Sequence, residues 1–135
     1  MRVVADSHAL IWYLIDDPHQ RLSEAAIEAL DRADATDGIA MSVATMIDLW
    51  YVVHTRRTLQ PADLAALRDL AADPDTNLQA VPVDMDIAAA FARIPLEPLR
   101  DPYDRLILAT AMALTVPLVT RDNKIRQSGL VTTIW

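Results

Sequence analysis

The sequence predicts an α/β protein, a three-layer α/β/α sandwich around a central parallel sheet of four to five strands. Three observations predict it. Short apolar runs recur along the chain, each is followed by a stretch with helical spacing, and proline, glycine or aspartate stands at most of the boundaries. Strands that alternate with helices form parallel sheets covered on both faces. The 135 residues, 53% of them hydrophobic, are enough for one domain, which we place at residues 1–135.

The first half of the chain contains two expected strands and four expected helices. The apolar run at 2–5 is the first strand, and Asp6 then opens a helix that we expect to end before Pro18. Ser23 begins the second helix, which ends near Gly38. The other elements of this half are a strand at 39–41, a long helix from Ser42 or Val43 to about Arg56, and a helix from Pro61 to about Ala72.

The second half contains two further expected strands, at 78–83 and 118–120. Asp84 is a natural N-cap for the helix that follows the first of them. Asp101 precedes a strongly apolar helix that ends before Pro117. The last elements are a helical turn at 122–126, ended by Gly129, and a candidate edge strand at 130–135.

The composition excludes several kinds of site. The absence of cysteine excludes disulfides, thiolate zinc sites and cysteine nucleophiles, so any metal must be held by oxygen or imidazole. Two glycines are too few for a glycine-rich nucleotide-binding loop. The longest uncharged stretch, 106–120, is too short to span a membrane, and the first residues lack the form of a secretory signal. We therefore expect a soluble cytoplasmic protein.

The net charge of −7 argues against a nucleic-acid partner, because affinity for phosphate ordinarily comes from basic surface. Two divalent cations held by four aspartates would reduce that charge to −3. Eleven of the twelve basic residues are arginine, the side chain best suited to bidentate phosphate contacts, and only Lys124 is lysine. The adjacent arginines at 56 and 57 could bind phosphates, but they are also compatible with a solvated helix end. The candidate residues for binding a nucleic acid are Arg56, Arg57, Arg105 and Arg121.

Aspartates follow the expected strands at the points where those strands end. Asp6 follows the first strand, and Thr120 with Asp122 follows the fourth. Asp104 lies in the first turn of the helix that leads to the fourth strand. Asp48 lies within a helix among apolar neighbours, where an unpaired charge is costly. Because ligands of open parallel sheets bind beyond the carboxyl ends of the strands, these side chains are candidates for one site.

Most of these aspartates also have a structural interpretation as helix caps. Aspartate is a preferred N-cap residue, and this applies to Asp6, Asp84 and Asp122. Asp101, followed by a proline and then by Asp104 at the third helical position, has the form of a capping box. We assign structural roles to Asp84 and Asp101. The coincidence of the other acids with Asp48, a poor mid-helix residue, favours a site.

A group of carboxylates has a defined metal chemistry. Several carboxylates in one crevice repel each other and raise one another's pKa unless a cation neutralises them. Hard oxygen ligands favour Mg²⁺ or Mn²⁺ over zinc. Such ions activate a water nucleophile and stabilise the charge that develops on a phosphodiester during displacement. The aspartates therefore indicate metal-dependent phosphodiester hydrolysis.

Four segments resemble, in order and spacing, the motifs of PIN-domain ribonucleases of the VapC toxin type. Residues 6–12, an aspartate, serine and histidine before an apolar helix with tryptophan, resemble the opening motif. Residues 42–48, with the pattern Ser-x-x-Thr-x-x-Asp, resemble the second motif, in which the family ordinarily ends on glutamate. Residues 101–111 and 118–122 are similar to the third and fourth motifs, so the resemblance covers nearly the whole chain.

The resemblance implies an RNA endonuclease toxin, homodimeric and kept inactive by a small cognate antitoxin. It implies that Mg²⁺ or Mn²⁺ is held by an acidic quartet, with Thr120 or Ser7 orienting a carboxylate or a water molecule. Asp48 is one methylene shorter than the usual glutamate, so we expect it to reach the metal through water and to weaken the affinity for metal. The quartet is Asp6, Asp48, Asp104 and Asp122.

Two other functions fit parts of the same pattern. A weakly active or inert PIN-fold module would act by binding its partner in a toxin-antitoxin complex, which the short Asp48 favours. A phosphoacceptor receiver domain also gathers acids beyond strand ends, but it needs an acidic pair after the first strand, where Asp6 stands alone. The aromatic side chains of Trp12, Trp50 and Tyr51 fit packing faces or a dimer interface better than base-stacking platforms.

Overall fold

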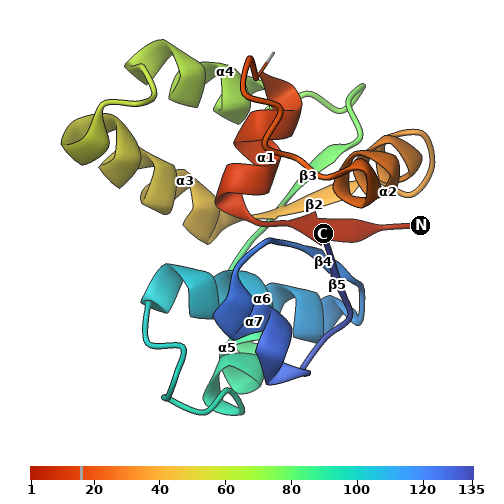
Figure 1. Cartoon of the computed structure of the whole chain (residues 1–135), viewed down its shortest axis with the longest axis vertical. Coiled ribbons are helices and arrows are strands. Elements are labelled where there is room, and N and C mark those ends of the chain that lie inside the picture. The colour runs from red at the N-terminus through yellow and green to blue at the C-terminus, as the bar shows by residue number, and fades with distance from the viewer. Residues whose placement is uncertain (16) are drawn as a thin grey trace.

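The computed structural model describes residues 1–15 and 17–135 and contains a five-stranded parallel sheet (Figure 1). All four strand pairings are parallel, and in the centre Val4 stands opposite Ala40 on one side and Leu118 on the other. The α/β prediction with a parallel sheet is confirmed. In sheet order the strands are β3 (Leu78–Val81), β2 (Ile39–Ser42), β1 (Val3–Ala5), β4 (Leu118–Val119) and β5 (Thr133–Ile134).

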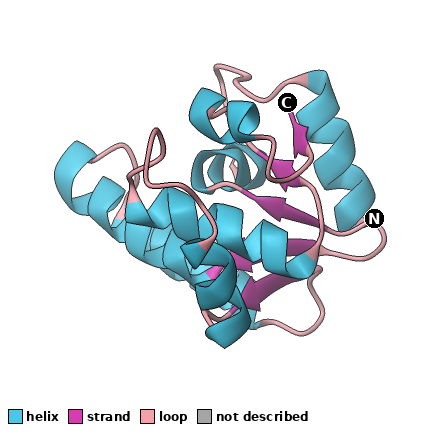
Figure 2. Ribbon diagram, turned by 90° about the horizontal axis from the view of Figure 1, so that it is seen from below, coloured by secondary structure: helices cyan, strands magenta, loops and turns pink. Residues whose placement is uncertain are grey.

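Helices cover both faces of this sheet, so the three-layer sandwich is also confirmed (Figures 1 and 2). The helices on the upper face in Figure 1 are α1 (Ser7–Leu14), α2 (Glu24–Asp34), α3 (Val43–Tyr51) and α4 (Pro61–Ala72). The helices below the sheet are α5 (Met85–Ala92), α6 (Pro102–Leu114) and α7 (Asn123–Ser128). Because α3 also contacts α6, it reaches along the edge where the two helical layers approach each other.

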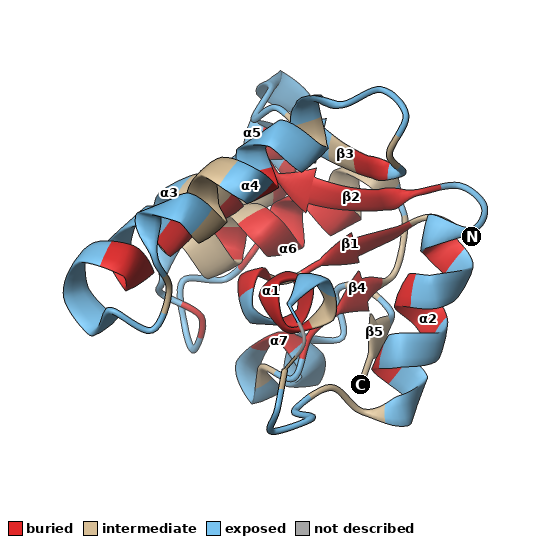
Figure 3. Ribbon diagram, turned by 90° about the horizontal axis from the view of Figure 1, so that it is seen from above, coloured by how far each residue is buried: buried red, intermediate tan, exposed pale blue. Residues whose placement is uncertain are grey.

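One hydrophobic core lies on each face of the sheet, because the side chains of a strand alternate between the two faces. Val3 and Ala5 pack into the core beneath α1 and α2. Val4 packs into the opposite core, with Leu108 of α6 and Ile125 of α7. Figure 3 shows the resulting pattern, in which β1, β2 and β4 are buried and the outer faces of the helices are exposed.

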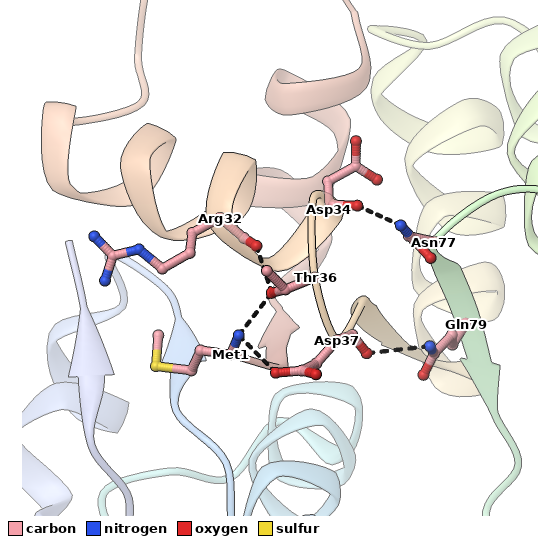
Figure 4. A network of polar contacts seen from close by, with 7 residues as sticks. All are labelled: Met1, Arg32, Asp34, Thr36, Asp37, Asn77 and Gln79. Atoms are coloured by element: carbon pink, nitrogen blue, oxygen red, sulfur yellow. Dashed lines mark hydrogen bonds and ion pairs between the residues drawn. The ribbon is translucent and has the colours of Figure 1, made fainter.

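A polar network lies at the amino ends of the strands (Figure 4). It joins the connection between α2 and β2 to Met1, which precedes β1, and to Asn77 and Gln79 at the start of β3. The N-terminal ammonium of Met1 donates to Thr36 Oγ1 (2.7 Å) and pairs with Asp37 (2.7 Å). Gly38 follows with φ +97°, and a side chain there would collide with Gln79. The residues drawn in the network are Met1, Arg32, Asp34, Thr36, Asp37, Asn77 and Gln79.

Some element boundaries differ from the sequence prediction. The first helix ends at Leu14 instead of just before Pro18, since Ile15 is extended (ψ 156°), and residue 16 of the expected helix lies outside the described residues. Strand β3 ends at Val81 instead of residue 83, because Pro82 has no N–H to donate to the ladder. The strand expected at 130–135 is shorter and pairs in parallel with β4.

The long helix expected to run to Arg56 changes its winding after α3. Residues Val52–Arg56 form a π-helix, η1, in which the Arg57 N–H donates to the Val52 carbonyl at 2.9 Å. Arg57 has a left-handed backbone (φ 56°) and ends the element. π-turns are frequent near functional sites. None of the helices described is long and apolar enough to cross a membrane.

Candidate active site

A hollow of about 500 Å³ lies beyond the carboxyl ends of β1 and β4, and aspartates dominate its lining. We call it the acidic pocket and define it by its five carboxylates. They come from the end of β1, from within α3, from both sides of the start of α6, and from the turn after β4. The structure therefore brings the whole predicted quartet into one place, with a fifth acid beside it. The five are Asp6, Asp48, Asp101, Asp104 and Asp122.

Hydrogen bonds hold the Asp6 carboxylate in position. Its Oδ1 accepts from the Ser7 N–H (2.7 Å) and its Oδ2 accepts from the hydroxyl of Thr120 (2.7 Å). Thr120 is fully buried, and its hydroxyl oxygen also accepts from the Asp122 N–H at 3.1 Å. One hydroxyl thus couples the acid after β1 to the acid after β4. The Ser7 hydroxyl instead lies 3.4 Å from the hydroxyl of Thr45, inside the protein.

Burial raises the pKa of Asp6 above its ordinary value, and the charge of Asp122 acts in the same direction. The hydrogen bonds from Thr120 and from the Ser7 N–H oppose this change, because they stabilise the ionised carboxylate. The charge of His8 also lowers the pKa of Asp6, but among the described residues no side chain forms an ion pair with this carboxylate.

The pKa of Asp104 shows most clearly that the acids share one electrostatic environment. Burial, followed by the charges of Asp6, Asp101, Asp122 and Asp48, raises the pKa of Asp104 to about 7. Each of these neighbours disfavours a further negative charge in the pocket. A bound cation would remove that disadvantage, which is the behaviour expected of a metal-ligand cluster.

All four aspartates named as candidate caps, Asp6 included, are helix N-caps, but capping does not separate the structural from the site residues. Asp101 accepts two backbone N–H bonds at the start of α6, and Asp122 Oδ1 accepts from Lys124 and Ile125 at the start of α7. Both line the acidic pocket. Asp84 caps α5 and lies outside the pocket, because it follows the edge strand β3. Asp101, assigned a structural role alone, is both a cap and part of the pocket wall.

The donor set fits a hard divalent cation, although the carboxylates are not closed around one position. Among residues 1–15 and 17–135, no three acidic or histidine side chains already enclose a place for a metal ion. The available donors are carboxylate oxygens, the ligands that Mg²⁺ and Mn²⁺ prefer. Asp48 is partly exposed on α3 and lines the pocket, so its carboxylate is among these donors.

The four candidate RNA-binding arginines have different surroundings. Arg56 and Arg121 line the acidic pocket, whereas Arg57 is exposed at the end of η1. The prediction for Arg105 is wrong. Its side chain is only 6% exposed and lies 4.7 Å from the ring centre of Phe91. The guanidinium donates to the carbonyls of four residues around the end of α5: Phe91, Ile94, Pro95 and Leu99.

Several pocket residues were not predicted from the sequence. Asn123 lies at the start of α7 beside Asp122, and its position directly after an acid motif was the available signal. Tyr51 was interpreted as a packing or dimer-interface residue, yet it is exposed at the pocket, and so is His8. Trp135 reaches the pocket by packing edge-on against Trp12 at 6.2 Å, a contact across the whole chain that no local pattern indicates.

The pKa of Asp104 predicts how the stability of the metal-free protein depends on pH. In the folded state Asp104 keeps its proton up to about pH 7, whereas in the unfolded chain it loses it near the ordinary value of 3.8. The folded state therefore binds more protons between these limits, and Asp104 makes the free energy of unfolding fall as pH rises through this window. We expect Asp104→Asn to gain stability over wild type between pH 5 and pH 8 in EDTA. Urea midpoints of both proteins measure this, and a difference independent of pH contradicts it.

Strand order distinguishes this fold from the receiver-type alternative. The order is β3-β2-β1-β4-β5, whereas flavodoxin-like receivers have the order 2-1-3-4-5. Asp6 also remains the single acid directly after β1. The phosphoacceptor interpretation is therefore not supported.

Comparison with known proteins identifies relatives over nearly the full length of the chain. Residues 3–129 match the family model of the PIN domain. Ribonuclease VapC22 of Mycobacterium tuberculosis is 33% identical over 125 residues, which cover 92% of this chain and 89% of that protein.

Two solved structures resemble the fold, at sequence identities that speak for the fold alone. One is VapBC2 from Rickettsia felis bound to a DNA fragment from their promoter, with a TM-score of 0.71 and 17% identity, covering 98% of this chain and 97% of that one. The other is a toxin-antitoxin complex from Klebsiella pneumoniae, with a TM-score of 0.64 and 20% identity, covering 97% and 96%.

Proposed function

The chain belongs to the PIN-domain family, and from this membership we propose that it is a ribonuclease toxin of the VapC type that hydrolyses RNA in its acidic pocket. The relative at 33% identity is a ribonuclease by name. One observation carries the proposal: four aspartates from separate parts of the chain line one hollow beyond the carboxyl ends of the central strands. They are Asp6, Asp48, Asp104 and Asp122.

Mg²⁺ or Mn²⁺ is the proposed cofactor, held by these four aspartates. Bound there, such an ion supplies an activated water and neutralises charge on the phosphodiester. The chain itself fixes the ligands. Thr120 holds the Asp6 carboxylate through a 2.7 Å hydrogen bond and, through the Asp122 N–H, fixes the turn that carries the second acid. Asp104, whose pKa is about 7 without a cation, must release its proton to act as a ligand.

Asp48 provides a test of the quartet, because glutamate is usual at this position in the proteins that the sequence resembles. If Asp48 reaches the cation only through water, Asp48→Glu should give a direct ligand and lower the metal concentration for half-maximal cleavage, by up to roughly tenfold. The rate of RNA cleavage is measured over a range of metal concentrations for wild type and Asp48→Glu. Asp48→Ala, which lacks the carboxylate, is the control. A melt of each variant detects overpacking, which costs about 1 to 3 kcal/mol. Equal metal midpoints for wild type, Asp48→Glu and Asp48→Ala would remove Asp48 from the site.

A cognate antitoxin is the proposed protein partner, and the cytoplasm the proposed location. The support is that a solved structure sharing this fold is a toxin-antitoxin complex. A second copy of the chain is also proposed as a partner. Its support is the apolar outer face of α3, where the side chains of Ile47 and Trp50 are 51% and 46% exposed.

RNA cleavage by the purified protein tests the proposed function. Total RNA and single-stranded oligoribonucleotides are incubated with protein in EDTA, in Mg²⁺ and in Mn²⁺, beside Asp6→Asn protein under the same conditions. We expect cleavage in either metal, none in EDTA and none by the variant. The short Asp48 keeps a second function open, that of an inert PIN-fold module acting through its partner. Folded wild-type protein that cleaves no RNA in either metal favours that module and contradicts the nuclease.

A further inference from the structure

A second hollow, of about 250 Å³, adjoins the acidic pocket on the side of α1 and η1. The two hollows share the side chains of His8, Trp12, Val52, Arg56 and Arg121. Because the same residues line both spaces, the two hollows are adjacent, and we call them together the groove. The negative charges lie in the acidic pocket, and the shared wall contributes two arginines.

Trp12 positions one of these arginines. The guanidinium of Arg121 lies 4.5 Å from the ring centre of Trp12, and that of Arg21 lies 4.7 Å from the same ring. The ring itself is buried and packed edge-on against Trp135. Arg21 is neutralised by Asp17 through an ion pair at 2.9 Å. Stacking on Trp12 thus limits the orientations of the Arg121 guanidinium, and its N–H groups can donate hydrogen bonds to a ligand in the groove.

The arginines of the groove do not pair with its carboxylates in the part of the chain that the structure describes. Among the described residues, none of the five pocket carboxylates forms an ion pair with Arg56 or Arg121, although all of them line the same hollow. Two cations that do not neutralise the neighbouring carboxylates are available to an anionic ligand. A phosphodiester strand whose reacting phosphate lies at the acids would place a neighbouring phosphate near this wall.

The groove also continues on the opposite side of the acids. A third hollow of about 430 Å³ shares Asp101, Asp104, Asp122 and Asn123 with the acidic pocket and is lined further on by Lys124. The acidic pocket therefore has a neighbouring hollow on each side. A single strand can extend from the reacting phosphate in both directions.

From this arrangement we propose that Arg121, braced on Trp12, and Arg56 form a phosphate-binding subsite for the RNA nucleotide adjacent to the cleaved bond. The proposal rests on the proposed function, since it assumes an RNA strand at the acidic pocket. Arginine suits the role because its planar fork donates two parallel hydrogen bonds to one phosphate. The pair acts on substrate binding, whereas the aspartates act on the reaction.

RNA binding without cleavage tests this subsite. The parent protein is Asp6→Asn in Mg²⁺, and the probe is a fluorescein-labelled, mixed-sequence, single-stranded 12-mer RNA followed by anisotropy over a range of KCl concentrations. We expect Arg121→Ala to weaken binding roughly tenfold and to reduce the slope of log K against log salt by about 1. Arg121→Lys should keep the slope and lose part of the affinity, because it keeps the charge without the fork. Arg56→Ala should act in the same direction as Arg121→Ala.

Arg126→Ala is the matched control, since it removes the same charge from an exposed position on α7 that lies outside all three hollows. It should leave affinity and slope unchanged. The subsite is overturned if Arg121→Ala and Arg56→Ala bind like the parent, if Arg126→Ala is equally impaired, or if the parent does not bind the RNA. A folded parent that binds RNA while the wild type cleaves none contradicts the proposed function and leaves the subsite standing, so the two failures are distinguishable.

Discussion

Asp104→Asn is expected to reduce RNA cleavage by more than roughly a hundredfold, because loss of a direct ligand should exceed the 10- to 100-fold cost of losing a residue that only orients one. The same change should raise the stability of the metal-free protein. Burial, followed by the charges of four other carboxylates, raises the pKa of Asp104 to about 7, and asparagine removes a charge that this environment disfavours. The cap of α6 is retained, since Asp101 supplies it.

Cleavage in Mg²⁺ and thermal melts in EDTA measure the two effects on one preparation. Asp84→Asn is the control, because it removes the same charge from a helix cap outside the acidic pocket and leaves a side chain that also caps. It should cleave like wild type. An Asp104→Asn protein that is less stable in EDTA and still cleaves RNA would show that Asp104 has a structural role only.

Arg105→Met is expected to cost at least about 3 kcal/mol of unfolding free energy, because hydrogen bonds to a charged group contribute roughly 1.5 to 3 kcal/mol each. Three carbonyls after α5, those of Ile94, Pro95 and Leu99, receive 2.7 to 2.8 Å bonds from this guanidinium. Methionine fills part of the volume and donates nothing, so buried carbonyls lose their partner. The loop from 95 to 100 leads directly into Asp101, so its loosening should also disturb the acidic pocket.

Urea unfolding of Arg105→Met beside Arg126→Met measures this effect. Arg126 carries the same charge and is exposed, so its replacement should shift the midpoint little. An Arg105→Met midpoint equal to that of Arg126→Met would contradict the assignment of Arg105 as the residue that fixes this loop.

The arrangement of strands and helices was predictable because each element carries its own local signal. Short apolar runs marked the strands, and Ser23, Pro61, Asp84 and Asp101 marked helix starts that the structure confirms. The errors lie where backbone geometry departs from a regular period. The π-helix η1 is only five residues long and follows α3 directly. So short a segment does not show a spacing of apolar residues different from that of an α-helix, and the sequence therefore did not distinguish η1 from a continuation of α3.

The candidate site was predictable to the extent that parallel strands bring their carboxyl ends to one edge. That rule placed Asp6 and Asp122 together, and the structure adds Asp48 through the length and direction of α3. Thr120 was also named from the sequence, as a candidate to orient a carboxylate. That its hydroxyl joins Asp6 to the turn of Asp122 follows only from the folded structure, because Asp6 and Thr120 are 114 residues apart.

Arg105 illustrates a different kind of error. A charged residue was assigned to the surface by its type, whereas its spacing of three and four residues from Leu108 and Ala109 places it on the buried face of α6. Helical periodicity was therefore the better guide than charge. The carbonyls that accept hydrogen bonds from the Arg105 guanidinium come from another segment, and their positions follow only from the folded structure.

The central claim is that the acidic quartet binds the divalent cation, and calorimetric titration of Mn²⁺ into the metal-free protein tests it most directly. Wild type, Asp6→Asn, Asp104→Asn and the control Asp84→Asn are titrated at pH 8, above the pKa of Asp104. We predict binding to wild type and to Asp84→Asn, and loss of that binding in both pocket variants. Equal binding by all four proteins would contradict the account, because it would place the cation outside the acidic pocket.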